Sequence, residues 1–243
     1  MKNSIGLFLL IALVLIIEVS SVVNFKEYKS EENTITTNSY YDLFDLEVKC
    51  QNKGAIKNFV IRTNAGKIYY DYSCYSSLTE ANENDESILK GAFKSETQTF
   101  KYQITESVES LKKVSISCPV DYALSGFTFS KNSNNYITAE YDCVGVKSAY
   151  QTKSNTITSG ASLQGPSTSL EPLNGLTCGD NTIETDEIPG TPLRGFRFDV
   201  EMSGSTAKLK YYYSYHKLRS IENERKAWAS KTKQFRDNNT QKN

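Results

Sequence analysis

The chain has 243 residues, which suits one compact all-β domain once a leader has been removed. Its 28 basic and 28 acidic side chains cancel, so no overall positive field would attract nucleic acid, and we expect no such partner. Tyrosine is abundant, with 16 residues, whereas Trp and His occur once each; this enrichment in aromatic residues favours half-buried strands.

Residues 1–21 have the features of a secretory signal peptide. Lys2 supplies the positive start, residues 5–17 are apolar, and the small residues at 19–21 fit a cleavage site. The alternative is an uncleaved membrane anchor that extends through Val23, but a span needs about 20 apolar residues and Glu18 interrupts this run. The sequence therefore favours a secreted protein, extracellular or at the cell surface, with membrane attachment only if the signal is retained.

Residues 22–39 are polar and read as a linker or a loose first strand. Residues 40–218 follow as a single all-β domain with three similar segments, at about 40–105, 106–165 and 166–218. Each segment has a lead-in before a cysteine. In the second, Val114, Ile116 and Cys118 alternate with polar residues, which predicts a strand with one buried face. The third lead-in, which ends at Cys178, matches the others if one residue is inserted.

After its lead-in, each segment predicts an antiparallel β-hairpin. In the first, the outgoing arm contains Phe59 and Ile61, and Asn64 and Gly66 lie in the turn because they tolerate positive φ. The returning arm alternates from Ile68 to Cys74. The equivalent turns are predicted at 132–135 and 203–205, and the third returning arm ends at Tyr215 instead of a cysteine.

The hairpins select a disulfide pairing. One cysteine precedes each outgoing arm and another ends each returning arm, and antiparallel pairing brings those ends together. The predicted bridges are Cys50–Cys74 and Cys118–Cys143, each closing a loop worth about 3 kcal/mol. Cys178 is left unpaired, as a free thiol, as half of an intermolecular disulfide, or as a buried inert cysteine.

The connecting and terminal segments carry weaker patterns. Residues 76–105 contain one further alternating strand around Phe100, whereas residues 147–169, rich in Ser, Thr and Gly, read as a loop with room for one short strand. Residues 219–243 predict a short amphipathic helix and a disordered polar end. The helix would lie against the domain or dock on a partner or a membrane surface.

No catalytic or metal-binding constellation stands out. His216 ends a strand without a Cys, Ser or Asp at motif spacing, so we expect a structural role. The acidic segment at 180–187 lacks the ordered spacing of a calcium loop, and we expect no metal and no cofactor. If the chain were instead a glycan-active hydrolase, Glu184, Asp186 or Asp199 would be its acid and base.

Tyrosines on the returning arms divide by parity. Most are expected in the core between sheets, with their hydroxyls reaching the rim. Tyr69, Tyr75 and Tyr212 lie at opposite parity or at a strand end, so they are the candidates for an exposed aromatic platform. Such a platform would bind a glycan or an extracellular protein.

The second segment also carries a family resemblance. Cys118-Pro119, Ala123-Leu124 and Gly126-Phe127 form the pattern CPxxxALxGFxF, which Gly195-Phe196 repeats in the third segment. This pattern resembles the repeat of the vitelline membrane outer layer protein I family. The resemblance implies a threefold β-prism, with a β-sandwich as the alternative, and a secreted coat or lectin-like protein.

Together these patterns predict a secreted, non-catalytic binding or structural protein of an extracellular coat, matrix or cell surface. We expect no enzymatic activity. Two alternatives remain open: the glycan-active hydrolase, and a subunit of an assembly linked by disulfides through Cys178.

Overall fold

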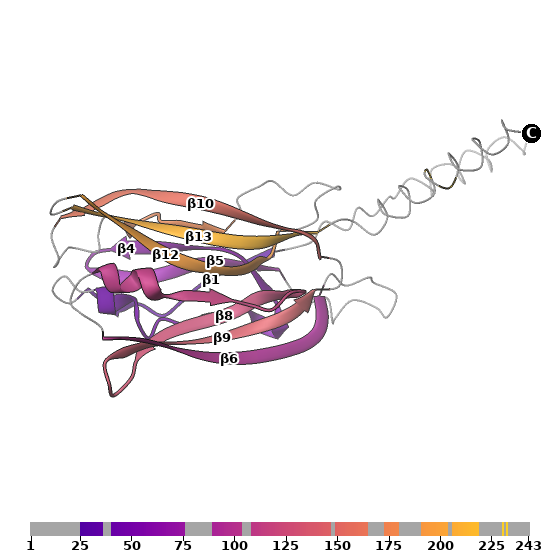
Figure 1. The fold of residues 1–243 in the computed structure, drawn as a ribbon, viewed down its shortest axis with the longest axis horizontal. Coiled ribbons are helices and arrows are strands. Elements are labelled where there is room, and N and C mark those ends of the chain that lie inside the picture. The colour runs from indigo at the N-terminus through magenta and orange to yellow at the C-terminus, as the bar shows by residue number, and fades with distance from the viewer. Residues whose placement is uncertain are drawn as a thin grey trace, which may run out of the picture.

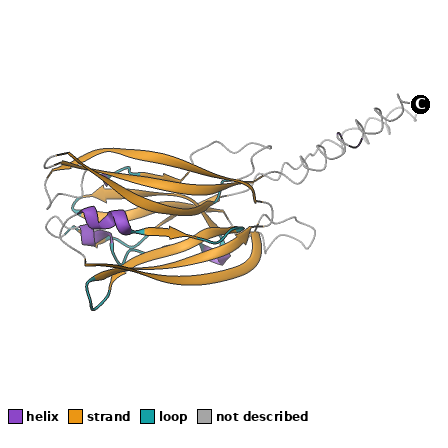
Figure 2. Cartoon of the chain, viewed as in Figure 1, coloured by secondary structure: helices purple, strands orange, loops and turns teal. Residues whose placement is uncertain are grey.

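A computed structural model describes residues 25–35, 40–75, 89–103, 108–146, 149–164, 173–179, 191–203 and 206–218, together with Ser230 and Thr232. The predicted signal peptide, the acidic segment with Glu184 and Asp186, and the predicted C-terminal helix, apart from those two helical residues, lie outside this part of the chain. The described chain consists of strands and short 3-10 helices (Figure 2), so the all-β prediction is confirmed.

The strands form three antiparallel sheets, named sheets A, B and C here. Sheet A runs in the order β1 (Phe25–Lys29), β5 (Lys67–Tyr75), β4 (Ala55–Asn64) and β11 (Thr177–Gly179), with β2 (Asn33–Thr34) also on β5. Sheet B runs in the order β6 (Leu89–Gln103), β9 (Tyr136–Val146), β8 (Tyr122–Lys131) and β3 (Val48–Lys49). Sheet C runs in the order β10 (Ala149–Gln164), β13 (Thr206–Leu218), β12 (Leu193–Ser203) and β7 (Ser115–Ser117).

All three sheets share one connectivity. Each has an outer strand, which is long in sheets B and C, then the two arms of a hairpin, and a short lead-in strand at its far edge. The lead-in comes from a different part of the chain: β3 precedes the hairpin of sheet A but joins sheet B, β7 precedes that of sheet B but joins sheet C, and β11 precedes that of sheet C but joins sheet A. The exchange is therefore cyclic and ties each sheet to the next. In Figure 1, sheet C lies at the top of the view and sheet B at the bottom.

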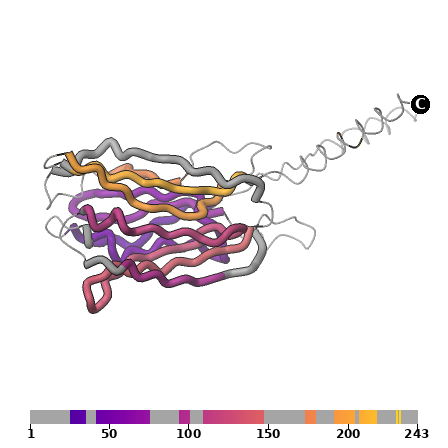
Figure 3. Tube along the Cα trace, viewed as in Figure 1, coloured from indigo at the N-terminus to yellow at the C-terminus, as the bar shows by residue number. Residues whose placement is uncertain are grey.

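The three sheets enclose one core. Phe59, Phe127 and Phe196 hold the same register position in β4, β8 and β12, opposite Tyr72, Tyr141 and Tyr213. Their ring centroids lie 4.9–5.0 Å apart in all three pairs. The strands run side by side along the length of this core (Figure 3). The arrangement is thus three-sided, not a two-layer sandwich, although the sequence repeat itself remains a prediction.

The lead-ins differ from the continuous strands that their alternation predicts. The first contains a 3-10 helix, η1 (Tyr40–Leu43), and only two residues of strand β3. The second contains η4 (Val108–Lys113) before the three-residue β7. A further 3-10 turn, η2 (Gln51–Lys53), connects Cys50 to β4.

Two of the three hairpin turns fall where predicted, and residues 204 and 205 of the third lie outside the described residues. Ala65 and Gly66 connect β4 to β5 with φ of 50° and 75°, the left-handed conformations of a tight hairpin turn. Lys131 ends β8 and Tyr136 begins β9, so the second turn also matches its prediction.

The connecting segments are where the sequence reading was wrong. Residues 149–164 form the long strand β10 and not a loop with a short strand. β6, in the segment assigned to the first hairpin, pairs with β9 of the second, and β10 pairs with β13 of the third. Each outer strand therefore belongs with the hairpin that follows it. Residues 22–39, by contrast, contain the first strand that was one of the two predictions for them: β1 pairs along β5.

Candidate functional site

Both predicted disulfides are present, Cys50–Cys74 and Cys118–Cys143. Their structural basis differs from the one that the hairpins suggested. Cys50 follows β3 in sheet B, whereas Cys74 lies in β5 of sheet A. The bridges therefore cross the corners between sheets and do not close a hairpin within one sheet. The second, in the same way, joins sheet C to sheet B.

The register also explains why Cys178 has no partner. Cys178 lies opposite Phe59, as Val48 lies opposite Phe127 and Ile116 opposite Phe196. It thus occupies the core position that Val48 and Ile116 occupy in the other two lead-ins. The bridged cysteines, Cys50 and Cys118, come two residues after that position. The one-residue insertion that aligned Cys178 with them was therefore wrong. Its thiol is fully buried, and burial raises its pKa well above the ordinary value. This environment matches the buried, inert interpretation.

The three candidate platform tyrosines do not lie together. Tyr69 is half-buried in sheet A with the Lys29 ammonium 3.9 Å from its ring centre. Tyr212 is half-buried in sheet C with the Arg197 guanidinium at 4.6 Å. Tyr75, expected to be exposed, is only 3% exposed and accepts a hydrogen bond from the Thr191 amide. The three side chains therefore cannot act as one surface for stacking.

His216 has the structural role that the sequence predicted. It is 1% exposed and its Nε2 lies 2.9 Å from the carbonyl oxygen of Tyr122. Its Nδ1 has no hydrogen-bond partner among the described residues. Burial lowers its pKa, which favours the neutral form of the ring between sheets C and B.

A polar hollow lies over the corner between sheets A and B, directly above the first disulfide. Its volume is about 820 Å³, and it is open to solvent. It is lined by the end of β1, by the lead-in around β3 and η2, and by single residues of β5, β8 and β9. The charged side chains that line it are Lys29, Lys49, Lys53, Glu31, Asp45, Glu47 and Asp142.

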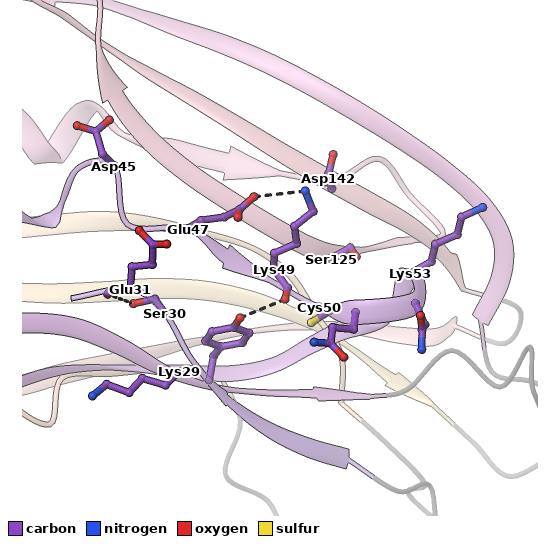
Figure 4. Close-up of a pocket in the computed structure, with 13 residues that line it drawn as sticks. Lys29, Ser30, Glu31, Asp45, Glu47, Lys49, Cys50, Lys53, Ser125 and Asp142 are labelled. Atoms are coloured by element: carbon purple, nitrogen blue, oxygen red, sulfur yellow. Dashed lines mark hydrogen bonds and ion pairs between the residues drawn. The ribbon is translucent and has the colours of Figure 1, made fainter. Parts of the chain in front are cut away.

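The side chains in the hollow are held by the corner itself. Glu47 and Lys49 extend from the same side of the lead-in (Figure 4), with Nζ and Oε1 3.3 Å apart. Tyr72 forms the floor: its hydroxyl donates to the carbonyl oxygen of Lys49 at 3.1 Å, and its ring stacks on Tyr28 at 5.5 Å. The pKa of Tyr72 is raised, mainly because its hydroxyl is partly buried.

The backbone of the hollow is fixed at two further points. The Cys50 amide donates to the carbonyl oxygen of Ser125, the bulge residue of β8, at 2.8 Å. Asn52 and Lys53 both have positive φ, at 51° and 56°, a conformation uncommon for residues other than glycine. The turn thus presents the Gln51 and Asn52 amides and the Lys53 ammonium, and the carboxylates come from other lining segments.

Sequence reasoning did not find this hollow. Its residues come from separate segments of the chain, and neither bridged cysteine marks them as a site. The one signal in the sequence was the alternation in the first lead-in, where the polar residues between the apolar ones, Glu47 and Lys49, are expected to be exposed. Of the candidate hydrolase carboxylates, only Asp199 is described, on β12 opposite Lys210 and away from the residues that line the hollow.

The described residues include no group of three or more His, Cys, Asp or Glu side chains placed to hold a metal ion. Within the same part of the chain, no helix is both long and apolar enough to cross a membrane. The resemblance to the vitelline membrane outer layer protein I family stays a prediction, because comparison with protein-family models, curated proteins and solved structures gave no match.

Proposed function

We propose that this chain is a secreted, non-catalytic binding protein of an extracellular coat, matrix or cell surface, and that the corner hollow binds glycan hydroxyl groups. Two intramolecular disulfides are consistent with an oxidising, extracellular setting. The proposal depends above all on one observation, the polar hollow over the Cys50–Cys74 corner.

The chemistry of the lining fits a hydroxyl-rich ligand. Carboxylates accept hydrogen bonds, ammonium groups donate them, and the Gln51 and Asn52 amides do both. All three kinds of group surround the hollow. Because both positive and negative charges line it, a neutral polar ligand would find partners without facing a single strong field. A sugar ring with several hydroxyl groups is such a ligand.

The frame favours binding because its groups are fixed in advance. The Cys50–Cys74 bridge, the Tyr72 hydrogen bond and the Cys50 amide bond all restrain the lead-in that carries Glu47 and Lys49. Fixing these groups before binding reduces the entropy lost when the ligand binds.

A glycan array probed with the oxidised chain tests the proposal, followed by calorimetric titration of the best ligand. The hollow variants are Glu47→Ala and Gln51→Ala, both of exposed residues, and each should weaken binding by about tenfold. Lys208→Ala, exposed on sheet C, is the matched control and should bind normally. An array without any ligand, or hollow variants that bind as well as the control, would overturn the proposal.

A further inference from the structure

β6 is the outer strand of sheet B, and along its length it pairs only with β9 among the described strands. Figure 1 shows it as the outermost strand on that side of the body. A strand has two hydrogen-bonding edges, so the second edge of β6 offers a row of backbone amides and carbonyls to another chain.

The middle of β6 is exposed on both faces. Residues 94–99 are all exposed, although alternate residues of a strand point to opposite faces, and burial resumes only at Phe100. The ladder with β9 is regular from Phe93 to Phe100 and is interrupted on either side of that stretch. Residues 94–99 therefore form an accessible edge with a regular register, named the β6 edge here.

Two opposite charges mark one face of this edge. Lys94 and Glu96 are two residues apart and so point to the same face. The Lys94 ammonium lies 4.7 Å from the centre of the Tyr122 ring. Glu96 lies beside Tyr141, whose pKa is raised by burial and then by the Glu96 charge. Each charge thus has an aromatic neighbour that limits where it lies.

We propose that a second copy of this chain pairs with the β6 edge in antiparallel register about a twofold axis at Ser95. In that register Lys94 of each copy lies opposite Glu96 of the other, which gives two attractive cross-strand pairs. An axis at Lys94 or at Glu96 would instead place two like charges opposite each other, which is destabilising. Charge complementarity thus selects the Ser95 axis, and sheet B continues from one copy into the next.

This pairing uses a different surface from the polar hollow and does not depend on glycan binding. The closest link is Asp142, which lines the hollow and whose carboxylate accepts a hydrogen bond from the Ser95 hydroxyl at 2.8 Å. A variant that no longer dimerises but still binds glycan, or one that no longer binds glycan but still dimerises, would separate the two proposals.

Light scattering and sedimentation of the oxidised chain test the dimer. Lys94→Glu and Glu96→Lys should each raise its dissociation constant about tenfold or more, because two attractive pairs become repulsive. The double variant Lys94→Glu/Glu96→Lys restores both pairs and should restore the dimer. The thermal midpoint of each variant checks that these exposed changes leave the fold intact.

A cross-linking pair tests the axis. Ser95→Cys places two thiols opposite each other across the twofold axis, within the range that a disulfide spans, and should give a covalent dimer on oxidation. Thr99→Cys is the matched control, since it lies on the same edge but away from the axis, and should cross-link much more slowly.

Three results would overturn the proposal. The first is a wild-type chain that stays monomeric at every soluble concentration. The second is a dimer that neither single charge reversal weakens or that the double variant fails to restore. The third is cross-linking through Thr99→Cys as fast as through Ser95→Cys.

Discussion

The three corners between the sheets are built on one plan but are closed in two ways. At two of them a disulfide joins the end of a lead-in to the returning arm of the neighbouring sheet, Cys50–Cys74 and Cys118–Cys143. At the third, between sheets C and A, Tyr215 occupies the register position of Cys74 and Cys143. No described bridge crosses it.

Noncovalent contacts take the place of the bridge at the third corner. The Thr191 amide, just before β12, donates to the Tyr75 hydroxyl in sheet A at 2.9 Å. Tyr215 packs beside Tyr213, with ring centroids 6.0 Å apart. The same joint between sheets can therefore be closed by a covalent link or by a buried tyrosine and a hydrogen bond, and the two closures should differ in strength.

The largest effects should come from the core, where the three sheets are alike. Phe59→Ala, Phe127→Ala and Phe196→Ala each remove one ring of the central triangle and should each cost about 3–5 kcal/mol of unfolding free energy. Urea unfolding measures these costs. Val120→Ala, at a residue 68% exposed, is the control and should change stability by less than about 0.5 kcal/mol. Very unequal losses of unfolding free energy among the three variants would mean that the difference between the bridged and unbridged corners also affects the core.

Removing the bridges should come next. Cys50→Ala/Cys74→Ala and Cys118→Ala/Cys143→Ala remove both partners of a bridge, so neither variant adds a free thiol to that of Cys178. The cysteines are 24 and 25 residues apart, and each variant should lose about 3 kcal/mol by the loop-entropy argument. Equal losses in urea unfolding would show that the two bridged corners are equivalent. A variant as stable as the wild type would contradict the role of its bridge.

The sequence predicted the parts of the fold in which apolar and polar residues alternate along a strand. The hairpin arms and the turn at Ala65 and Gly66 follow from alternating apolar residues. Both cysteine pairings were also predicted, although each bridge joins two sheets and does not close a hairpin. The outer strand β10 was missed because its Ser, Thr and Gly residues resemble those of a loop. β10 has no alternating apolar pattern of its own, and it is identified as a strand by its pairing with β13.

The cyclic exchange of lead-ins was also beyond the sequence. The two residues of β3 and the three of β7 and β11 carry no signal that says which sheet they join. Cys178 was misaligned for the same reason, since only its pairing with Phe59 places it at a core position. The hollow depends on that exchange. The lead-in with Glu47 and Lys49 lies at the corner with sheet A because it pairs with the edge of sheet B.

A smaller effect should come from the corner without a bridge. Tyr75→Phe removes the acceptor of the Thr191 amide and leaves a buried N–H unpaired, which should cost about 1–3 kcal/mol. Tyr69→Phe, a half-buried tyrosine on the same strand, is the matched control and should change stability by less than about 0.5 kcal/mol. If Tyr75→Phe were equally neutral in urea unfolding, that hydrogen bond would not contribute to closing the corner.

The smallest effect should be a pH dependence at the same end of the molecule. His216 is buried next to Tyr215, and burial lowers its pKa below the ordinary value of 6.5. The charged groups near it are Arg194, which lowers the pKa further, and Asp121, which with the Tyr122 carbonyl opposes that change. The unfolded chain therefore takes up a proton at higher pH than the folded chain does.

The contribution of His216 to stability is thus complete above about pH 6.5 and decreases as the pH falls towards the folded pKa. In His216→Gln the side chain does not titrate, so the slope of unfolding free energy against pH should be shallower than in the wild type as the pH falls below about 6.5. Unfolding by urea at a series of pH values measures both slopes. Equal slopes would mean that protonation of His216 does not distinguish the folded from the unfolded chain, and any pH dependence of stability in this range would then come from other groups.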